Sequence, residues 1–266
     1  MVESMAGQYL LAIDVGNTNA VFGMFEGETL VGSWRLATAE DRTADEYAAM
    51  LMPLCAHAGL RREAVGGAVI ASVVPPLTPI MTELVERYWS VTPLLISHSL
   101  HTGLVIKYDR PGEVGADRIC DAVATKALYG SPSIFIDFGT ATTFNAIDAA
   151  GDYLGGAIAP GINLSMEALA RYAAQLHRIE LVAPPSAIGR NTVHAMQSGV
   201  FLGYLGLVES MTERFQHELG GRARVIATGG LSTLIGPATP MIEIIDPLLT
   251  IKGLRMIWEM NRSRVG

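Results

Sequence analysis

One pattern occurs twice in this chain and constrains its fold more than any other feature. It is an apolar strand ending in Asp, then a Gly turn, then hydroxyl or amide side chains. The first copy reads IDVGNT at residues 13–18, and the second reads IDFGTA at residues 136–141. The offset of 123 residues also holds at Val31-Gly32 against Leu154-Gly155. This ungapped repeat indicates two copies of one supersecondary unit.

The residue types in the pattern are those that hold the phosphates of a nucleotide. The Asp carboxylate can bind a cation directly or through water. The Gly lets backbone N–H groups approach an anion, and Thr and Asn side chains donate hydrogen bonds to phosphate oxygens. A single copy would more often be an ordinary hairpin turn. Because two copies stand in matching strand contexts, we interpret them as phosphate loops on the two sides of a nucleotide cleft.

Composition excludes several other classes of protein. Of the 266 residues, 50% are hydrophobic and only 17% are charged, so long disordered segments are not expected. The formal net charge of −7 and the absence of a Lys/Arg run argue against a nucleic-acid-binding protein. An ATP site remains compatible with this charge, because ATP arrives with a divalent cation and is bound largely by backbone dipoles.

The sequence also indicates a cellular location. Cys55 and Cys120 are the only cysteines, and neither belongs to a C-x-x-C pair, so we expect buried thiols in a reducing compartment and no zinc site. The first residues include an acid and no basic stretch, which is not typical of a signal peptide. No uncharged stretch is typical of a membrane span. We therefore expect a soluble cytoplasmic protein that does not bind membranes.

Hydrophobic periodicity predicts the same order of elements, βββαβαβ, in both halves of the chain. We expect an N-terminal half of residues 1–112 and a C-terminal half of residues 113–266, because Gly and Pro cluster in residues 98–115. Two such halves flanking a nucleotide cleft describe an α/β protein of the ribonuclease H-like, actin-like ATPase architecture, which sugar kinases, actin and heat-shock chaperones share. That analogy does not choose a function.

The individual elements follow from apolar runs and helix-start signals. Strands are expected at about 9–15, 20–26, 30–35, 68–74, 93–96, 133–138, 142–148, 153–159, 224–227 and 241–245. Helices are expected from the Thr43–Glu46 capping box to about 58, from Leu77 to Tyr88, after Gly115, from Pro160-Gly161 to about 176, from about 190 to 219, and from about 250.

Residues 108–118, which read YDRPGEVGADR, place an Asp where a helix begins. Asp117 would lie in the first turn, and two interpretations are open. It can be a structural charge that complements the helix dipole, with Arg118 as a solvated partner. It can instead be a proton acceptor for a reaction, and a helix-start position would then be expected to keep its pKa low. Spacing alone does not decide between them.

The whole chain resembles the type III pantothenate kinases, bacterial enzymes that open coenzyme A biosynthesis. The resemblance rests on motifs that run from end to end. They are DVGNTN at 14–19, WRLAT at 34–38, EVGADR at 113–118, DFGTAT at 137–142, Gly155-Gly156 through Pro160-Gly161, GRNT at 189–192 and ATGG at 227–230.

The resemblance implies ATP-dependent phosphorylation of pantothenate to 4′-phosphopantothenate, with magnesium bridging the phosphates through Asp14 and water. It implies that Asp117 is the proton acceptor and that Asp137 binds a monovalent cation, potassium or ammonium. It also implies an active homodimer whose pantothenate pocket is completed near the subunit interface. The implied ATP contacts are Asp14, Val15, Gly16, Asn17, Thr18, Asn19, Ala20, Val21 and Thr140, and the implied pantothenate contacts are Tyr108, Gly115, Ala116, Asp117, Arg118 and Thr192.

Several alternatives remain open at this point. Arg110 stands where the family usually carries Asn, which leaves the contact of Tyr108 open. Gly229-Gly230 is either the adenosine site or a Gly-rich turn, and the helix at 190–219 is either core or a subunit interface. Another small-molecule kinase, for a sugar or acetate, is one rival function. A catalytically silent nucleotide-binding regulatory protein is another, which the intact Asp14, Asp117 and Asp137 disfavour.

Overall fold

The computed structural model describes residues 8–173 and 176–264, which form two compact units. Unit 1 comprises the chain up to Leu104, Tyr108–Ala124 and the chain from Leu249 on. Unit 2 comprises Val105–Lys107 and Thr125–Leu248. The expected halves, 1–112 and 113–266, divide the chain at one point. Unit 1 instead combines the first strands with Tyr108–Ala124 and with the chain from Leu249 on.

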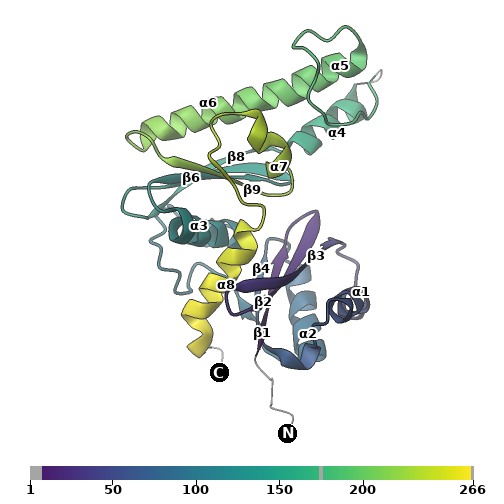
Figure 1. Ribbon diagram of the computed structural model, residues 1–266, viewed down its shortest axis with the longest axis vertical. Coiled ribbons are helices and arrows are strands. Elements are labelled where there is room, and N and C mark those ends of the chain that lie inside the picture. Colours follow the sequence, from purple (N-terminus) through teal and green to yellow (C-terminus); the bar gives the residue numbers. More distant parts are fainter. Residues whose placement is uncertain (1–7, 174–175, 265–266) are drawn as a thin grey trace. The chain divides into compact units, whose positions relative to one another are not determined.

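The sheet of unit 1 has the order β3-β2-β1-β4-β5 (Figure 1). Strands β1, β2 and β3 are antiparallel neighbours, whereas β4 and β5 continue the sheet in parallel from β1. Asp14 near the end of β1 is paired with Val21 on one side and with Ala71 on the other. The strands are β1 (Tyr9–Val15), β2 (Asn19–Glu26), β3 (Thr29–Ala37), β4 (Val65–Ser72) and β5 (Leu94–Leu95).

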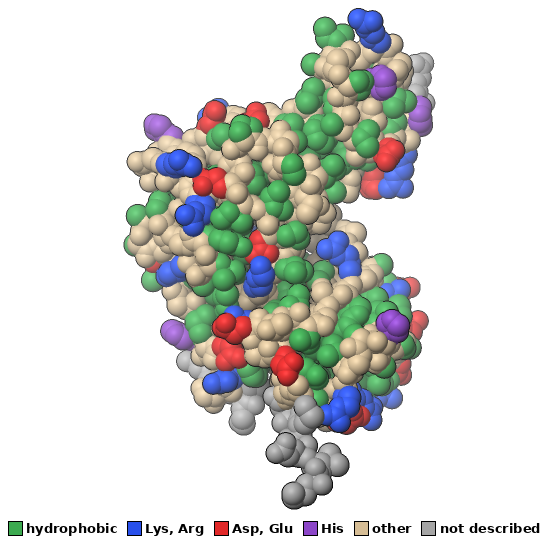
Figure 2. Space-filling model, in the orientation of Figure 1, with side chains coloured by type: hydrophobic (Ala, Val, Ile, Leu, Met, Phe, Trp, Pro, Cys, Tyr) green, Lys and Arg blue, Asp and Glu red, His purple; other side chains and the backbone are tan. Residues whose placement is uncertain are grey.

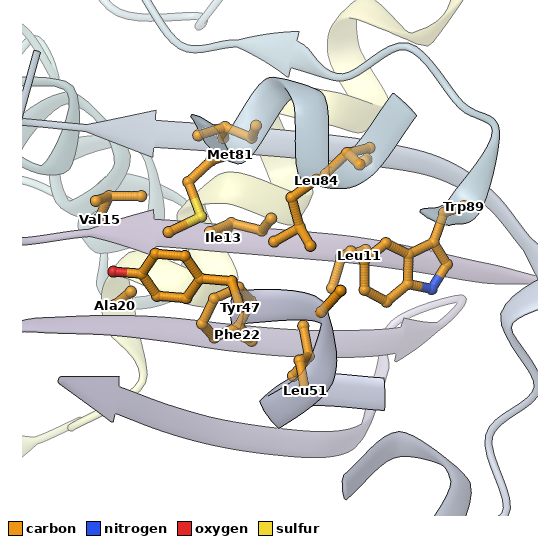
Figure 3. Packing of buried hydrophobic residues seen from close by; sticks show 14 of the residues in the cluster. Leu11, Ile13, Val15, Ala20, Phe22, Tyr47, Leu51, Met81, Leu84 and Trp89 are labelled. Atoms are coloured by element: carbon orange, nitrogen blue, oxygen red, sulfur yellow. The ribbon is translucent and has the colours of Figure 1, made fainter. Parts of the chain in front are cut away.

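Helices cover both faces of this sheet. Helices α1 (Ala44–His57) and α2 (Leu77–Trp89) cover one face, where Leu11, Ile13, Phe22, Tyr47, Leu51 and Leu84 make a closed apolar core (Figure 3). Helix α8 (Leu249–Asn261) covers the other face. A Cβ on Gly23, which is paired with Ala12, would lie 2.7 Å from Ile251. Side chains alternate along β1, so Ala12 and Ile13 point to opposite faces.

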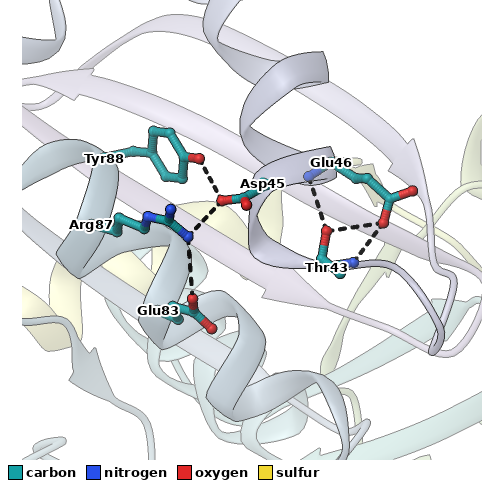
Figure 4. A network of polar contacts seen from close by, with 6 residues as sticks. All are labelled: Thr43, Asp45, Glu46, Glu83, Arg87 and Tyr88. Carbon is teal, nitrogen blue, oxygen red and sulfur yellow. Dashed lines mark hydrogen bonds and ion pairs between the residues drawn. The ribbon is translucent and has the colours of Figure 1, made fainter.

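The predicted capping box at the start of α1 is confirmed. The Thr43 hydroxyl accepts the backbone N–H of Glu46, and the Glu46 carboxylate accepts the backbone N–H of Thr43 at 2.8 Å (Figure 4). Nearby, Asp45 accepts hydrogen bonds from Arg87 at 2.8 Å and from the Tyr88 hydroxyl at 2.5 Å, which joins α1 to α2. These charges are exposed, so the packing of the apolar core dominates the contact between the two helices.

Unit 2 repeats the topology of unit 1, which confirms the duplicated βββαβαβ order. Its sheet has the order β10-β9-β6-β7-β8, with β6, β7 and β8 antiparallel and β9 and β10 parallel to β6. The strands are β6 (Ser133–Phe138), β7 (Ala141–Ile147), β8 (Tyr153–Pro160), β9 (Arg224–Thr228) and β10 (Ile244–Ile245).

The helices of unit 2 differ from the prediction in one respect. The helix expected over 190–219 consists of α5 (Thr192–Gln197), a π-helical turn η3 (Ser198–Leu202) and α6 (Gly203–Glu218). With α4 (Ile162–Tyr172), these elements cover one face of the sheet around Ile134, Ile136, Phe138 and Phe144 (Figure 1). Helix α4 ends at Tyr172, before the predicted end at about 176, and residues 174–175 lie outside the described residues.

Helix α3 (Ala116–Tyr129) begins in unit 1 and ends in unit 2. Shorter helical segments are α7 (Ser232–Ile235), η1 (Arg62–Ala64), η2 (Pro111–Glu113), η4 (Gly236–Ala238) and η5 (Arg262–Arg264). On the face seen in Figure 2, Lys/Arg and Asp/Glu side chains are interspersed with one another. Among the helices of residues 8–173 and 176–264, none has both the length and the apolar character needed to cross a bilayer.

Candidate active site

The first phosphate loop lies between β1 and β2 of unit 1. The backbone N–H of Gly16 donates to the carbonyl oxygen of Asn19 at 3.1 Å, which closes a tight turn. Asn17 and Thr18 are exposed at the tip of this turn, and Asp14 at its base is half-buried. The loop therefore presents amide and hydroxyl side chains to solvent directly above a carboxylate.

Thr38, just after β3, holds this loop in place. Its hydroxyl donates to the carbonyl oxygen of Gly16 at 2.7 Å, and its backbone N–H donates to the carbonyl oxygen of Thr18 at 3.0 Å. Sequence reasoning included Thr38 in a family motif but gave it no role. The signal that could have found it is the strand pairing, because an antiparallel β2–β3 hairpin returns the end of β3 to the start of β2.

The segment before α3 places Asp117 in the first turn of the helix, as predicted. Gly115 makes this placement possible, because a Cβ at position 115 would lie 2.5 Å from Oδ1 of Asp117. The same oxygen accepts the backbone N–H of Arg118 at 2.7 Å. The carboxylate is therefore positioned by its own helix start and by the absence of a side chain two residues earlier.

The prediction that Asp117 has a low pKa is wrong. Burial of the carboxyl group raises its pKa above the ordinary value, and this outweighs the backbone N–H and the positive charge of Arg118, which lower it. The helix dipole acts within the same turn, but the loss of water around the charged form is the larger effect. A carboxylate with a raised pKa is a better proton acceptor once it is ionised.

Two other residues of this segment are in contact. The guanidinium of Arg118 lies over the ring of Tyr108, 5.8 Å from the ring centroid, and Arg118 is buried. This cation–π contact orients both side chains. Arg110 forms an exposed ion pair with Glu113 at 3.1 Å.

Asp14 and Asp117 lie in one electrostatic neighbourhood of unit 1. Both carboxylates, together with Asp121, raise the pKa of the Cys120 thiol, which burial raises first and most. Cys120 is therefore a neutral buried thiol rather than a nucleophile. Asp121 is 1% exposed and accepts a hydrogen bond from Thr250 at 2.7 Å. Sequence reasoning missed Asp121, although its position four residues after Asp117 places it on the same face of α3.

The second phosphate loop lies between β6 and β7 of unit 2. The backbone N–H of Gly139 donates to the carbonyl oxygen of Ala141 at 3.2 Å, which closes a turn one residue shorter than that of the first loop. Thr140 is exposed at the tip, and Asp137 is half-buried at the base. The backbone of Gly161, at the start of α4, donates to the carbonyl oxygen of Thr140 at 3.2 Å. A Cβ on Gly161 would lie 2.3 Å from that oxygen.

Gly229 lies against Asp137, and this close approach explains why the first residue of the Gly229-Gly230 pair is a glycine. Its φ is +86°, in the left-handed region, and a Cβ at this position would lie 2.1 Å from Oδ1 of Asp137. The turn after β9 therefore borders the carboxylate of the second loop. The Gly-rich turn is observed, and a role of this turn as the adenosine site stays a prediction.

Thr192 lies in unit 2, as the first residue of α5, and it is exposed. Asn191 caps this helix by accepting the backbone N–H of His194 at 2.8 Å. Gly189 allows the chain to cross the helix, because a Cβ there would lie 2.3 Å from the backbone nitrogen of Ala195. The GRNT motif therefore folds Thr192 onto a short helix that is separate from the second phosphate loop.

Comparison with known proteins gives a consistent result. The family model for type III pantothenate kinase matches residues 10–214. A type III pantothenate kinase of Moorella thermoacetica is 51% identical over 252 residues, which cover 95% of this chain and 99% of that protein.

Two crystal structures share the fold at lower identity. One is described as that of a Baf family transcriptional activator from Campylobacter jejuni, with a TM-score of 0.63, 19% identity and coverage of 95% and 99% of the two chains. The other is an inorganic polyphosphate/ATP-glucomannokinase from Arthrobacter, with a TM-score of 0.50, 16% identity and coverage of 97% and 100%. At these identities the structures indicate the fold alone.

Proposed function

We propose that this chain, which belongs to the type III pantothenate kinase family, phosphorylates pantothenate to 4′-phosphopantothenate with ATP, the first step of coenzyme A biosynthesis. The observation that carries the proposal is the carboxylate of Asp117, which is held at a helix start and acts on Cys120 together with Asp14 of the first phosphate loop. A proton acceptor next to a nucleotide-phosphate loop is the arrangement that transfer to an alcohol requires.

In the proposed reaction, Asp117 orients the 4′-hydroxyl of pantothenate and accepts its proton. A bond forms between that oxygen and the γ-phosphorus of ATP, and the bond to the β–γ bridging oxygen breaks, so ADP leaves with the electron pair. Phosphoryl transfer needs little covalent work from the protein, because positioning and charge stabilisation supply most of the rate. The raised pKa of Asp117 suits an acceptor that takes the proton late.

ATP with a divalent cation is expected from the kinase family, and the residues fit it. We assign ATP contacts to Asp14–Val21 of the first loop, and the contact of Thr140 with ATP stays a prediction. Asp14 is a half-buried carboxylate below exposed amide and hydroxyl groups, which is a donor set for a hydrated magnesium ion and for phosphate oxygens. Magnesium would neutralise charge on the phosphates, while the exposed loop side chains hold their oxygens.

We assign a monovalent cation, potassium or ammonium, to Asp137. Thr228 is the partner of Asp137 on the neighbouring strand β9, so both side chains point to the same face of the sheet. Its hydroxyl oxygen is buried, with no hydrogen-bond partner within the described part of the chain. A bound cation would satisfy this oxygen. No group of three or more His, Cys, Asp and Glu residues able to hold a metal ion occurs in residues 8–173 and 176–264, so hydroxyl and carbonyl oxygens would complete the site.

We assign the pantothenate pocket of unit 1 to Tyr108 and Gly115–Arg118, and the contact of Thr192 with pantothenate stays a prediction. Support comes from the Arg118–Tyr108 contact, which keeps an arginine and an aromatic ring beside Asp117. A buried guanidinium is suited to the carboxylate of pantothenate, because it offers several donors in a fixed plane. Arg110 is engaged with Glu113 at the surface, so its replacement of Asn is compatible with this pocket.

We also propose that the active form is a homodimer formed through the helical layer of unit 2. Large apolar side chains in and next to this layer are exposed, among them Tyr172 at the end of α4 and Ile188 in the segment before α5, each 80% exposed. In Figure 2, hydrophobic side chains recur over α4 and α5. An apolar surface of this kind is typical of an interface. Light scattering after size exclusion would test it, and Tyr172→Asp should shift a dimer toward monomer.

An ADP-release assay with purified full-length chain tests the function. We expect ADP formation that depends on pantothenate, in the presence of ATP, magnesium and potassium. Glucose and acetate serve as controls for the rival kinases, and neither should support turnover. Turnover with a control substrate would favour another small-molecule kinase. Nucleotide binding without turnover would favour a catalytically silent regulatory protein.

A further inference from the structure

Tyr204, in the first turn of α6, packs against both ends of the second phosphate loop. Its hydroxyl forms a hydrogen bond with the hydroxyl of Thr142, in β7 just after the loop. Its ring lies against Phe138, the last residue of β6 before the loop, with ring centroids 6.2 Å apart. Tyr204 is 7% exposed and Thr142 is fully buried. One side chain therefore joins the two strand ends between which Gly139–Ala141 must turn.

The same hydroxyl also lies close to the start of α4. The N-cap of α4 is Gly161, which has no side chain to satisfy the free N–H groups of the first turn. The backbone N–H of Ile162 lies near the Tyr204 hydroxyl and lowers its pKa. Gly161 donates to the carbonyl oxygen of Thr140 at 3.2 Å. Tyr204 therefore lies beside the segment that contacts the tip of the loop, and it packs against both ends of the loop.

Tyr204 acts from the face of the sheet opposite to Asp137. Phe138 belongs to the core on the α6 side, and Asp137, its neighbour along β6, points to the other face. Burial raises the pKa of the Tyr204 hydroxyl, and the nearby charge of Asp137 raises it further. The hydroxyl therefore stays protonated at neutral pH. It can therefore donate a hydrogen bond to Thr142.

The helix that carries Tyr204 is irregular immediately before it. The π-helical turn η3 (Ser198–Leu202) ends one residue before α6 begins at Gly203. A π turn changes the direction in which the following side chains face, and such turns are frequent at functional sites. The uninterrupted helix that the sequence predicted would give Tyr204 a different direction relative to α5.

We propose that Tyr204 is a positioning residue for nucleotide binding: its ring and hydroxyl fix the second phosphate loop in the arrangement that receives the phosphates of ATP. It acts through Phe138 and Thr142 at the two ends of the loop. The identity of the nucleotide rests on the proposed function. Loss of the hydroxyl would leave the Thr142 hydroxyl buried without this partner, so the loop would rearrange.

Tyr204→Phe tests the proposal, because it removes only the hydroxyl. We expect the Kd for magnesium-ATP, measured by calorimetry without pantothenate, to rise about 3–10-fold, the size expected for one lost hydrogen bond. The KM for ATP should rise similarly, while the KM for pantothenate stays within about twofold of wild type, below the cost of a lost hydrogen bond. Tyr129→Phe is the matched control, because the Tyr129 hydroxyl donates to Asp246 at 2.7 Å elsewhere in unit 2.

Thr142 provides a second test that holds if Tyr204→Phe does not fold. Thr142→Val should weaken nucleotide binding as Tyr204→Phe does, Thr142→Ser should retain it, and the double variant Tyr204→Phe/Thr142→Val should be no weaker than either single variant. An unchanged Kd in folded Tyr204→Phe, or an equal loss in Tyr129→Phe, overturns the proposal. Nucleotide affinity is measured without pantothenate. The result can therefore be interpreted even if pantothenate proves not to be the substrate.

Discussion

A Cβ at position 115 would lie 2.5 Å from Oδ1 of Asp117. Gly115→Ala should therefore push the carboxylate out of place while leaving every charged group present. We expect kcat to fall roughly 100-fold, because a misplacement of about 1 Å can cost that much. Steady-state kinetics check this against Gly112→Ala, in the same segment, whose Cβ would meet only the edge of the His98 ring at 3.3 Å. Equal activity in the two variants would contradict a role of Gly115 in positioning the Asp117 carboxylate.

Asp117→Asn separates chemistry from structure. Turnover should fall by about 10²–10⁴-fold, the usual contribution of a general base, while ATP binding survives. The substitution should also stabilise the protein, whereas loss of a helix-capping charge would destabilise it. Because burial raises the pKa of Asp117, the wild-type protein loses stability as pH rises from the ordinary Asp pKa through the raised one.

Neutral Asn avoids that loss, so Asp117→Asn should melt at a higher temperature than wild type at pH 7, and the difference should shrink in acid. Turnover and melting temperature are measured on the same sample. Near-normal turnover in a slightly destabilised protein would mean that Asp117 is a structural acid at a helix start.

Potassium should act through Asp137 and Thr228. Replacing potassium by lithium should lower activity, and potassium should raise the melting temperature of the nucleotide-bound protein. Asp137→Asn and Thr228→Val should both weaken this thermal shift, since each removes an oxygen from the assigned site. Ser133→Ala is a control on the same strand as Asp137, because its buried hydroxyl lies at the other end of β6. A thermal shift unchanged in both site variants would contradict the assignment.

The architecture followed from the sequence because its signals are local. Strand ends at Asp14 and Asp137, the capping box at Thr43 and the helix start at Ala116 all depend on neighbours in the chain, and all were predicted. The duplicated order of elements along the chain, βββαβαβ, then followed from the repeat.

Tertiary effects could not be predicted in this way. The pKa of Asp117 depends on burial by residues distant in sequence, and it is raised rather than lowered. The π turn before Tyr204 depends on packing, which periodicity does not encode. The hydrogen bond from Thr38 to the first loop depends on strand pairing, which periodicity does not encode either. The return of the last helix to unit 1 is likewise a long-range effect.

Lys107 should make stability depend on pH in a second way. Its ammonium group lies 2.9 Å from both Asp148 and Asp152, and the hydrogen bond from Lys107 lowers the pKa of Asp148. A lowered acid pKa stabilises the fold above the ordinary Asp value, and this stabilisation is lost as pH falls through the lowered pKa. Lys107→Met should therefore reduce the melting temperature at pH 7.

The reduction should disappear in strong acid, and high salt should diminish it at pH 7, because the group is exposed enough to be screened. Arg62→Met is the control, since Arg62 pairs only with its exposed neighbour Glu63 among the ion pairs of the described chain. A pH-independent difference between Lys107→Met and wild type would show that lost packing of the lysine stem, rather than charge, sets the effect.

The identity of the phosphorylated product is the most direct test of the proposed pantothenate kinase activity. Purified protein is incubated with ATP, magnesium, potassium and pantothenate, and the product is analysed by mass spectrometry and phosphorus NMR. We expect pantothenate that carries one phosphoryl group on its 4′-hydroxyl, formed in equal amount to ADP. This product should be nearly absent with Asp117→Asn. Unmodified pantothenate beside released ADP and inorganic phosphate, or phosphorylation at another position, would contradict it.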